Sequence, residues 1–196
     1  MRRLALVILI ILVFMCVFGV YAALKRPLLH IAFLNVSKGD AILITTPSDN
    51  RALIDGGPDQ SVLFALGREM PFYVRSIDIV LATSQKSSDI GGLPFVFDRF
   101  NVGAFVDSGL SSKTTTYKTV LNDVSQKNIP RITANMGDDI NLGNGAHFLV
   151  LSSGAEITGK IIYGQTSISI PADIPNLASS TDDIVFESDG TNIWRK

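Results

Sequence analysis

Residues 75–97 read RSIDIVLATSQKSSDIGGLPFVF and contain the strand, the loop and the helix start from which the fold can be predicted. Ser76 to Thr83 is mainly apolar, which is typical of a strand that is buried on both faces of a sheet. A polar loop from Ser84 to Asp89 follows, and Gly91 to Phe100 has the composition of a short helix. A buried strand that leads through a loop into a helix is the repeating unit of layered α/β domains.

The flanking segments extend this pattern in both directions. Before it, we expect three strands that form a meander and one helix with apolar residues at helical spacing. These elements are His30 to Leu34, Ala41 to Thr46, Arg51 to Ile54 and the helix Ser61 to Met70. After it, we expect strands at 102–106, near 132, and at 139–142, 147–151, 160–163, 167–170 and 183–187, and a helix over 116–127. The sequence thus predicts one layered α/β domain.

The N-terminal segment differs from the rest of the chain. Leu4 to Leu24 is 21 residues long without a charge, and as a helix it would span roughly 30 Å, the thickness of a bilayer's hydrocarbon core. We predict that residues 1–27 form a single-pass membrane anchor with its linker, and that residues 28–196 form the folded domain. Arg2 and Arg3 favour a cytoplasmic N-terminus and a domain outside the cytoplasm. The alternative is a cleaved signal peptide, although its apolar run would be unusually long.

Charge and cysteine content exclude several classes of function. The chain has 196 residues and a net charge of -1, so no basic field indicates strong nucleic-acid binding. Cys16 is the one cysteine and lies in the anchor segment, so the folded domain has neither a disulfide nor a thiolate metal ligand. The bulky Met15 before it argues against lipid modification of Cys16.

Five short motifs between Ile31 and Gly109 carry a resemblance to a known family. They are FLNVSKGDAILITTP, ALIDGGP, LFALGREMPFYVRSIDIVLATS, DIGGLPFVFDRFNV and AFVDSG. In order and spacing they resemble the metallo-β-lactamase fold, and more narrowly the extracellular domain of competence-type DNA-internalisation proteins (the ComEC family). The resemblance implies an αββα sandwich, here reduced in its C-terminal half, and it suggests a role linked to DNA uptake.

The family's zinc-binding motif, H-x-H-x-D-H, falls on residues 84–89, where this sequence departs from it. The histidine positions hold Ser84, Lys86 and Asp89, and the aspartate position holds Ser88. Zinc takes imidazole, thiolate or carboxylate ligands, whereas a hydroxyl is a poor ligand and a lysine repels the ion. The departure predicts a pseudoenzyme that holds neither zinc nor another cofactor.

A second interpretation keeps a metal site built from oxygen ligands. The resemblance places Asp173, in the segment YGQTSISIPAD, where a bridging carboxylate belongs. If Asp55, Asp89 and Asp173 meet in one cleft, they would suit Mg²⁺ or Ca²⁺, and the protein would be a hydrolase or phosphodiesterase with a rebuilt site. The main interpretation instead makes Asp55 a hydrogen-bonding cap of its loop. His30 and His147 are expected at surface or edge-strand positions outside the site.

Other polar and glycine positions are given structural roles. Gly91 and Gly92 are expected to allow close packing of a helix start, in preference to binding an anion. A solvated helix face is expected to hold Tyr117, Lys118, Lys127 and Arg131. The sequence thus predicts a membrane-anchored, catalytically inactive binding or structural module with an unknown protein partner. DNA is the ligand that the resemblance suggests.

Overall fold

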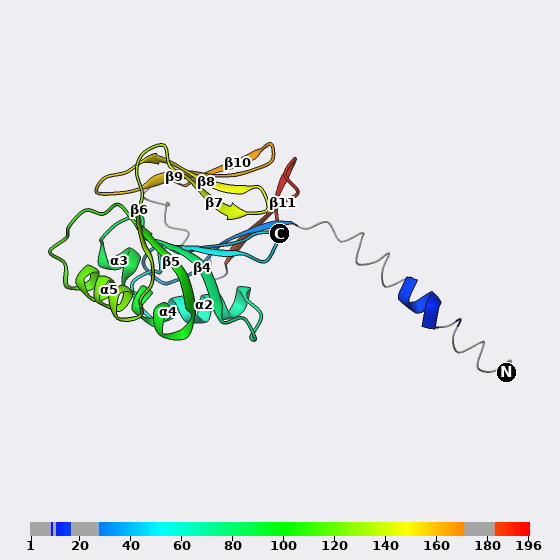
Figure 1. The fold of residues 1–196 in the computed structure, drawn as a ribbon, viewed down its shortest axis with the longest axis horizontal. Coiled ribbons are helices and arrows are strands. Elements are labelled where there is room, and N and C mark those ends of the chain that lie inside the picture. The colour runs from blue at the N-terminus through cyan, green and yellow to red at the C-terminus, as the bar shows by residue number, and fades with distance from the viewer. Residues whose placement is uncertain (1–8, 10, 17–27, 171–182) are drawn as a thin grey trace.

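The computed structural model describes residue 9 and residues 11–16, 28–170 and 183–196 (Figure 1). The strands of the larger sheet are β1 (Leu29–Phe33), β2 (Ile42–Thr45), β3 (Arg51–Ile54), β4 (Ser76–Leu81), β5 (Asn101–Asp107), β6 (Arg131–Thr133), β11 (Ile184–Ser188) and β12 (Ile193–Arg195). The strands of the smaller sheet are β7 (Asp139–Gly143), β8 (Ala146–Ser152), β9 (Thr158–Tyr163) and β10 (Thr166–Ile170). The helices are α2 (Ser61–Glu69), α3 (Ser87–Ile90), α4 (Leu93–Arg99) and α5 (Thr115–Gln126).

The larger sheet combines an antiparallel part with a parallel part. Its strand order is β12-β11-β1-β2-β3-β4-β5-β6. The predicted meander of β1, β2 and β3 is confirmed, because each neighbouring pair is antiparallel. From β3 to β6 the neighbours are parallel. Parallel neighbours need a crossover connection, and the helices α2 to α5 lie in these connections.

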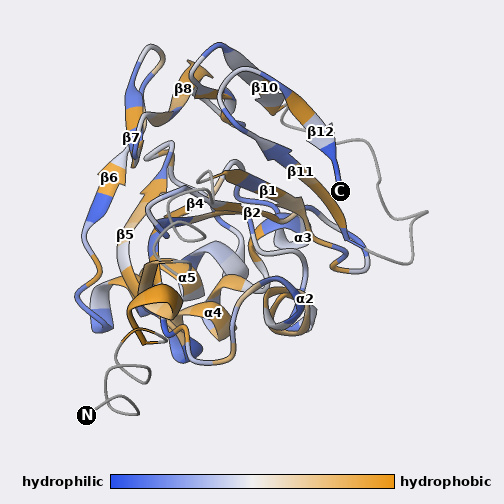
Figure 2. Cartoon of the chain, turned by 90° about the vertical axis from the view of Figure 1, so that its right-hand side faces the viewer, coloured by the Kyte–Doolittle hydropathy of each residue, from blue (hydrophilic) through white to orange (hydrophobic). Residues whose placement is uncertain are grey.

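Two apolar cores lie on opposite faces of the larger sheet. Side chains alternate between the faces of a strand, so in β2 Leu43 faces the helices while Ile42 and Ile44 face the smaller sheet. The helices form the first layer, the larger sheet forms the second and the smaller sheet forms the third. Figure 2 shows α2, α4 and α5 on one side of the larger sheet and β8 and β10 on the other.

The described residues form three layers of the αββα sandwich, which was predicted in a form reduced in its C-terminal half. The full sandwich requires helices on the outer face of the smaller sheet, and the described residues place none there (Figure 1). The strands β7 to β10 follow one another through short connections, and residues 171–182 after β10 lie outside the described part of the chain. Positive-φ residues such as Asn144 and Gly164 form the turns at which two of these connections reverse direction.

The expected strands and helices are found within two residues of their predicted bounds, with two corrections. The loop predicted from Ser84 to Asp89 becomes helical at Ser87, because Lys86 O accepts the amides of Asp89 and Ile90 and the Ile90 side chain is wholly buried. Strand β12 was not predicted. Its side chains are exposed and show no alternation, so only pairing with β11 defines it.

The predicted anchor falls mostly outside the described residues. Of Leu4 to Leu24, the structure describes residue 9 and residues 11–16, which are helical and exposed. None of the helices in the described part of the chain has both the length and the apolar character needed to cross a membrane. The anchor and the boundary after residue 27 therefore stay predictions.

Candidate functional site

The carboxyl ends of β3, β4 and β5 meet at one edge of the larger sheet, because these neighbouring strands are parallel. Ligands commonly bind at this edge of open α/β sheets. Asp55 directly follows β3, Thr83 and Ser84 come just after β4, and Asp107 ends β5. The predicted loop thus lies beside Asp55, at the end of the molecule where Figure 1 shows α3.

Asp55 is buried, and both of its carboxylate oxygens accept hydrogen bonds from Thr83. The Thr83 amide donates over 2.8 Å and the hydroxyl over 2.5 Å. These bonds join the loop after β3 to the loop after β4, as the predicted capping role requires. Burial raises the pKa of the Asp55 carboxyl well above 3.8. The Thr83 hydrogen bonds oppose this rise in pKa, and the charges of Asp89 and Asp40 add to it.

Asp89 is also buried, and its carboxylate is enclosed by two serines of its own loop. Ser84 Oγ donates to Oδ2 over 2.5 Å, and Ser88 Oγ donates to Oδ1 over 2.6 Å. The main-chain oxygen of Asp89 accepts the Gly56 amide over 2.7 Å, which ties this loop to the one after β3. Both oxygens of the Asp89 carboxylate are therefore already engaged by hydroxyl donors.

Lys86 connects the loop to the smaller sheet. Its ammonium forms an ion pair with Glu156, which lies between β8 and β9. Ser84 and Glu156 also form a β-bridge, and the Ile157 amide donates to Thr83 O over 2.7 Å. Sequence analysis did not identify Glu156, because it lies 70 residues after Lys86 and outside the quoted motifs.

A third buried carboxylate at this edge, Asp107, was not identified from the sequence. Asp107 accepts the Tyr117 hydroxyl over 2.6 Å and Arg131 Nη2 over 2.8 Å, and Arg131 also donates to the Tyr117 oxygen over 3.0 Å. Burial and the neighbouring Asp107 raise the pKa of Tyr117 to about 12. The prediction of a solvated Tyr117 is wrong. Its spacing with Val120 and Val124 on one helix face indicates burial, and this signal was available in the sequence.

The paired glycines after α3 have the packing role that was predicted. A Cβ at Gly91 would lie 2.1 Å from Pro58 O, and one at Gly92 would lie 2.0 Å from Gly56 O. Real Cβ atoms do not approach oxygen so closely, so only glycine lets α4 begin directly against the loop after β3.

Three predicted residues remain, namely Asp173, His30 and His147. Asp173 lies outside the described residues. His30 lies near the start of β1, at the opposite end of the sheet, and its imidazole contacts the Glu187 carboxylate. The His147 imidazole contacts the Asp139 carboxylate. Both histidines lie at the surface, as one of the two predicted placements requires, since their side chains are 40% and 36% exposed. Their strands β1 and β8 have neighbours on both sides and are not edge strands.

The donor set at residues 84–89 does not fit a zinc ion. Of Ser84, Lys86, Ser88 and Asp89, only Asp89 carries a carboxylate, and its two oxygens accept serine hydroxyls. Zinc sites use at least three nitrogen, sulfur or carboxylate ligands. Within residues 28–170 and 183–196, no three His, Cys, Asp or Glu side chains are placed to hold a metal.

Comparison with known proteins relates this chain to others by structure alone. No protein-family model matches it, and no curated protein matches its sequence. A Cronobacter sakazakii metallo-β-lactamase with a HARLDQ motif aligns at a TM-score of 0.51 and 13% identity, over 74% of this chain and 61% of that chain. Zinc-bound PqqB from Methylobacterium extorquens aligns at 0.49 and 16% identity, over 66% of this chain and 47% of that one.

Both alignments leave part of the larger protein without a counterpart, since this chain spans 61% of the first and 47% of the second. Because the sequence identity is 13%, the first alignment supports a shared fold and gives no information on catalytic activity. The order of the strands, the helical crossovers and this alignment agree with one another. The chain has a metallo-β-lactamase fold.

Proposed function

We propose that this chain is a membrane-tethered, catalytically inactive metallo-β-lactamase-fold protein, which acts outside the cytoplasm as a binding or structural module. One observation supports this proposal above the others. The hydroxyls of Ser84 and Ser88 each donate a hydrogen bond to one oxygen of the Asp89 carboxylate, so residues of the loop itself satisfy this carboxylate. Each Asp89 oxygen keeps a second lone pair, but Asp89 is the one carboxylate of this loop, and a metal site needs further ligands that Ser84, Lys86 and Ser88 do not supply. Lys86, paired with Glu156, adds positive charge to the same loop.

The partner in this proposal is an unknown protein at the outer face of the membrane. DNA is the ligand that the family resemblance suggests, but a net charge of -1 gives little counterion release on binding. Fluorescence anisotropy with the full chain in detergent is expected to show only weak, salt-sensitive DNA binding. A pull-down from membranes with the full chain as bait would identify the protein partner.

Metal content and hydrolysis test the loss of catalysis. The full chain is purified in detergent, incubated with Zn²⁺, Mn²⁺ or Mg²⁺, desalted and analysed for metal. Wild type and Asp89→Asn are both expected to retain far less than one ion per chain and to leave bis(p-nitrophenyl) phosphate intact. One retained ion per wild-type chain, absent from Asp89→Asn and accompanied by hydrolysis, would contradict the proposal.

A second candidate is a phosphodiesterase with an oxygen-ligand cation site. The observation in its favour is that the buried Asp55 carboxyl experiences the negative charges of Asp89 and Asp40, which a divalent cation would offset. Thermal shift with Mg²⁺ and Ca²⁺ distinguishes the two functions. Stabilisation of the wild type that disappears in Asp89→Asn favours the enzyme, and equal melting curves favour the inactive module.

A further inference from the structure

The strand pairing identifies which end of the domain lies next to the N-terminal segment. β1 begins at this end, and His30 pairs with Thr45 at the end of β2. Thr45 in turn pairs with Arg51 at the start of β3, and Ala52 lies beside Ile79 of the parallel β4. The first residues of β1, β3 and β4 therefore share one edge, which is opposite the edge that carries the candidate site.

The connection between α2 and β4, residues 70–75, lies at this same edge. A hollow of about 250 Å³ is lined by both His30 of β1 and Pro71 of the connection, which brings the two segments together in space. Residues 70–75 are therefore close to the point where the chain enters the domain from its N-terminal segment.

Two aromatic side chains project from this connection into solvent. Phe72 is 86% exposed and Tyr73 is 70% exposed, and their rings contact each other edge to face at 5.6 Å. Neither ring contributes to a core of the described domain. Adjacent exposed aromatic residues of this size are a common mark of an interaction surface.

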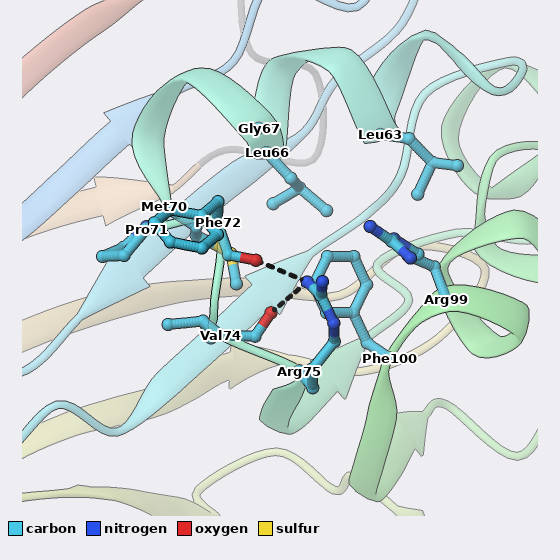
Figure 3. Close-up of a pocket in the computed structure, with 10 residues that line it drawn as sticks. All are labelled: Leu63, Leu66, Gly67, Met70, Pro71, Phe72, Val74, Arg75, Arg99 and Phe100. Carbon is cyan, nitrogen blue, oxygen red and sulfur yellow. Dashed lines mark hydrogen bonds between the residues drawn. The ribbon is translucent and has the colours of Figure 1, made fainter.

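Two arginines lie close to Phe72. Arg75 Nη1 donates to Phe72 O over 2.7 Å and to Val74 O over 3.1 Å, which holds the connection in its shape. Arg75 and Arg99 line one hollow of about 270 Å³ together with Phe72 and Phe100, and Figure 3 shows both guanidinium groups in it. Aromatic rings and arginines together suit the water–lipid interface, where the rings enter the headgroup layer and the cations meet phosphates.

The length of chain before β1 limits how far this edge can be from a membrane. Leu29 follows Leu24, the last residue of the apolar segment, by five residues, and five residues reach at most about 18 Å. We propose that Phe72 and Tyr73, together with Arg75 and Arg99, dock into the headgroup layer of the bilayer that residues 4–24 span. This proposal rests on the membrane tether in the proposed function.

Docking at this edge gives the domain one orientation on the membrane. The tether alone would let the domain rotate, whereas a second contact beside β1 restrains it. Asp55, Asp89 and Asp107 at the carboxyl ends of the strands would then face away from the lipid and toward a partner in solution.

Tryptophan fluorescence in proteoliposomes tests this contact with the full chain. Trp194, the one tryptophan of the chain, is replaced by Phe, and Phe72→Trp is introduced as the probe. The matched control is Met136→Trp, because Met136 is 74% exposed and follows β6, whose carboxyl end lies at the opposite edge. Vesicles contain phosphatidylglycerol and phosphatidylcholine brominated on the acyl chains, which quenches only tryptophans close to lipid.

Flotation with the vesicles is measured first, and the expected result is that both variants float and F72W is quenched several-fold more than M136W. Flotation with equal quenching of F72W and M136W would overturn the docking while leaving the tether intact. A blue-shifted but unquenched F72W would mean that the connection packs against protein, which also overturns docking. Failure of both variants to float would overturn the tether and, with it, the docking.

Discussion

The acidic residues at the carboxyl ends of the parallel strands each have their own hydrogen-bond donors. Asp55 accepts hydrogen bonds from Thr83, Asp89 accepts them from two serines, and Asp107 accepts them from a tyrosine and an arginine. Buried carboxylates are tolerated only when such donors replace water. These donors therefore satisfy the acidic side chains that lie at the carboxyl ends of the parallel strands.

Asp55→Asn should change the pH dependence of stability. The folded-state pKa of Asp55 is raised, so its stabilising contribution is complete below pH 3.8 and is lost as the pH rises toward that raised pKa. Asparagine does not titrate, so the free energy of unfolding of the variant minus that of the wild type should increase with pH over this window. The increase should be about 1.4 kcal/mol for each unit by which the pKa is raised. Urea denaturation in metal-free buffer from pH 3.5 upward (roughly the ordinary carboxyl pKa) measures it, and a difference that is constant with pH would contradict the assignment.

Tyr117→Phe should destabilise the domain by about 1–3 kcal/mol, because Asp107 and Arg131 each lose a buried hydrogen-bond partner. The measurement is thermal or urea denaturation at neutral pH. Tyr73→Phe removes a hydroxyl from an exposed ring and is the matched control, expected to leave stability unchanged. Equal stability of the two variants would show that the Asp107 cluster has no net stabilising effect.

Among the elements, α3 and α4 depend most on backbone contact with the loop after β3. Gly56 donates to Asp89 O, and Gly92 donates to Gly57 O over 2.9 Å. These main-chain bonds position both the polar loop and the start of α4 against β3. A side chain at Gly92 would occupy the same space as the main chain of that loop.

Gly92→Ala should therefore lower the free energy of unfolding by roughly 1–3 kcal/mol, as expected for an overpacked contact. Gly67→Ala is the matched control in α2, since no heavy atom lies within 4 Å of its added Cβ. It should raise the free energy of unfolding by about 0.5–1 kcal/mol through helix propensity. Urea denaturation measures both variants, and a neutral Gly92→Ala would mean that α4 can shift away from β3.

Elements with a regular hydrophobic pattern could be located from the sequence, and elements without one could not. The apolar runs of β2, β3 and β4 and the helical spacing in α2 were sufficient to locate them. β12 was missed because its three residues are exposed, and its place depends on hydrogen bonds to β11. The helical turn of α3 was missed because its polar sequence resembles a loop, and tertiary burial of Ile90 stabilises it.

On the scale of the whole molecule, the chain enters at one end of the larger sheet and the candidate site lies at the other (Figure 1). The parallel strands cause this separation, because every carboxyl end faces away from the edge at which β1 begins. If residues 4–24 span a bilayer, the site projects from the membrane surface.

Thiol labelling tests this topology in cells that express the full chain. Cys16→Ser removes the one native thiol, and Lys113→Cys adds an exposed thiol in the connection between β5 and α5. A membrane-impermeant maleimide should label this variant in intact cells, while a cytoplasmic thiol protein stays unlabelled until the cells are permeabilised. Labelling only after permeabilisation would place the domain in the cytoplasm.

The amino-acid sequence by itself determined the strand and helix pattern, the motifs that resemble a metallo-β-lactamase fold, and the absence of histidine and cysteine from residues 84–89. These follow from local periodicity and residue type. Only the tertiary structure decided that serines close the Asp89 carboxylate, that Lys86 pairs with Glu156, and that Arg131 and Tyr117 meet Asp107. Such contacts join residues that are distant in the chain or depend on side-chain direction, and these are set by the packing of the sheets and helices.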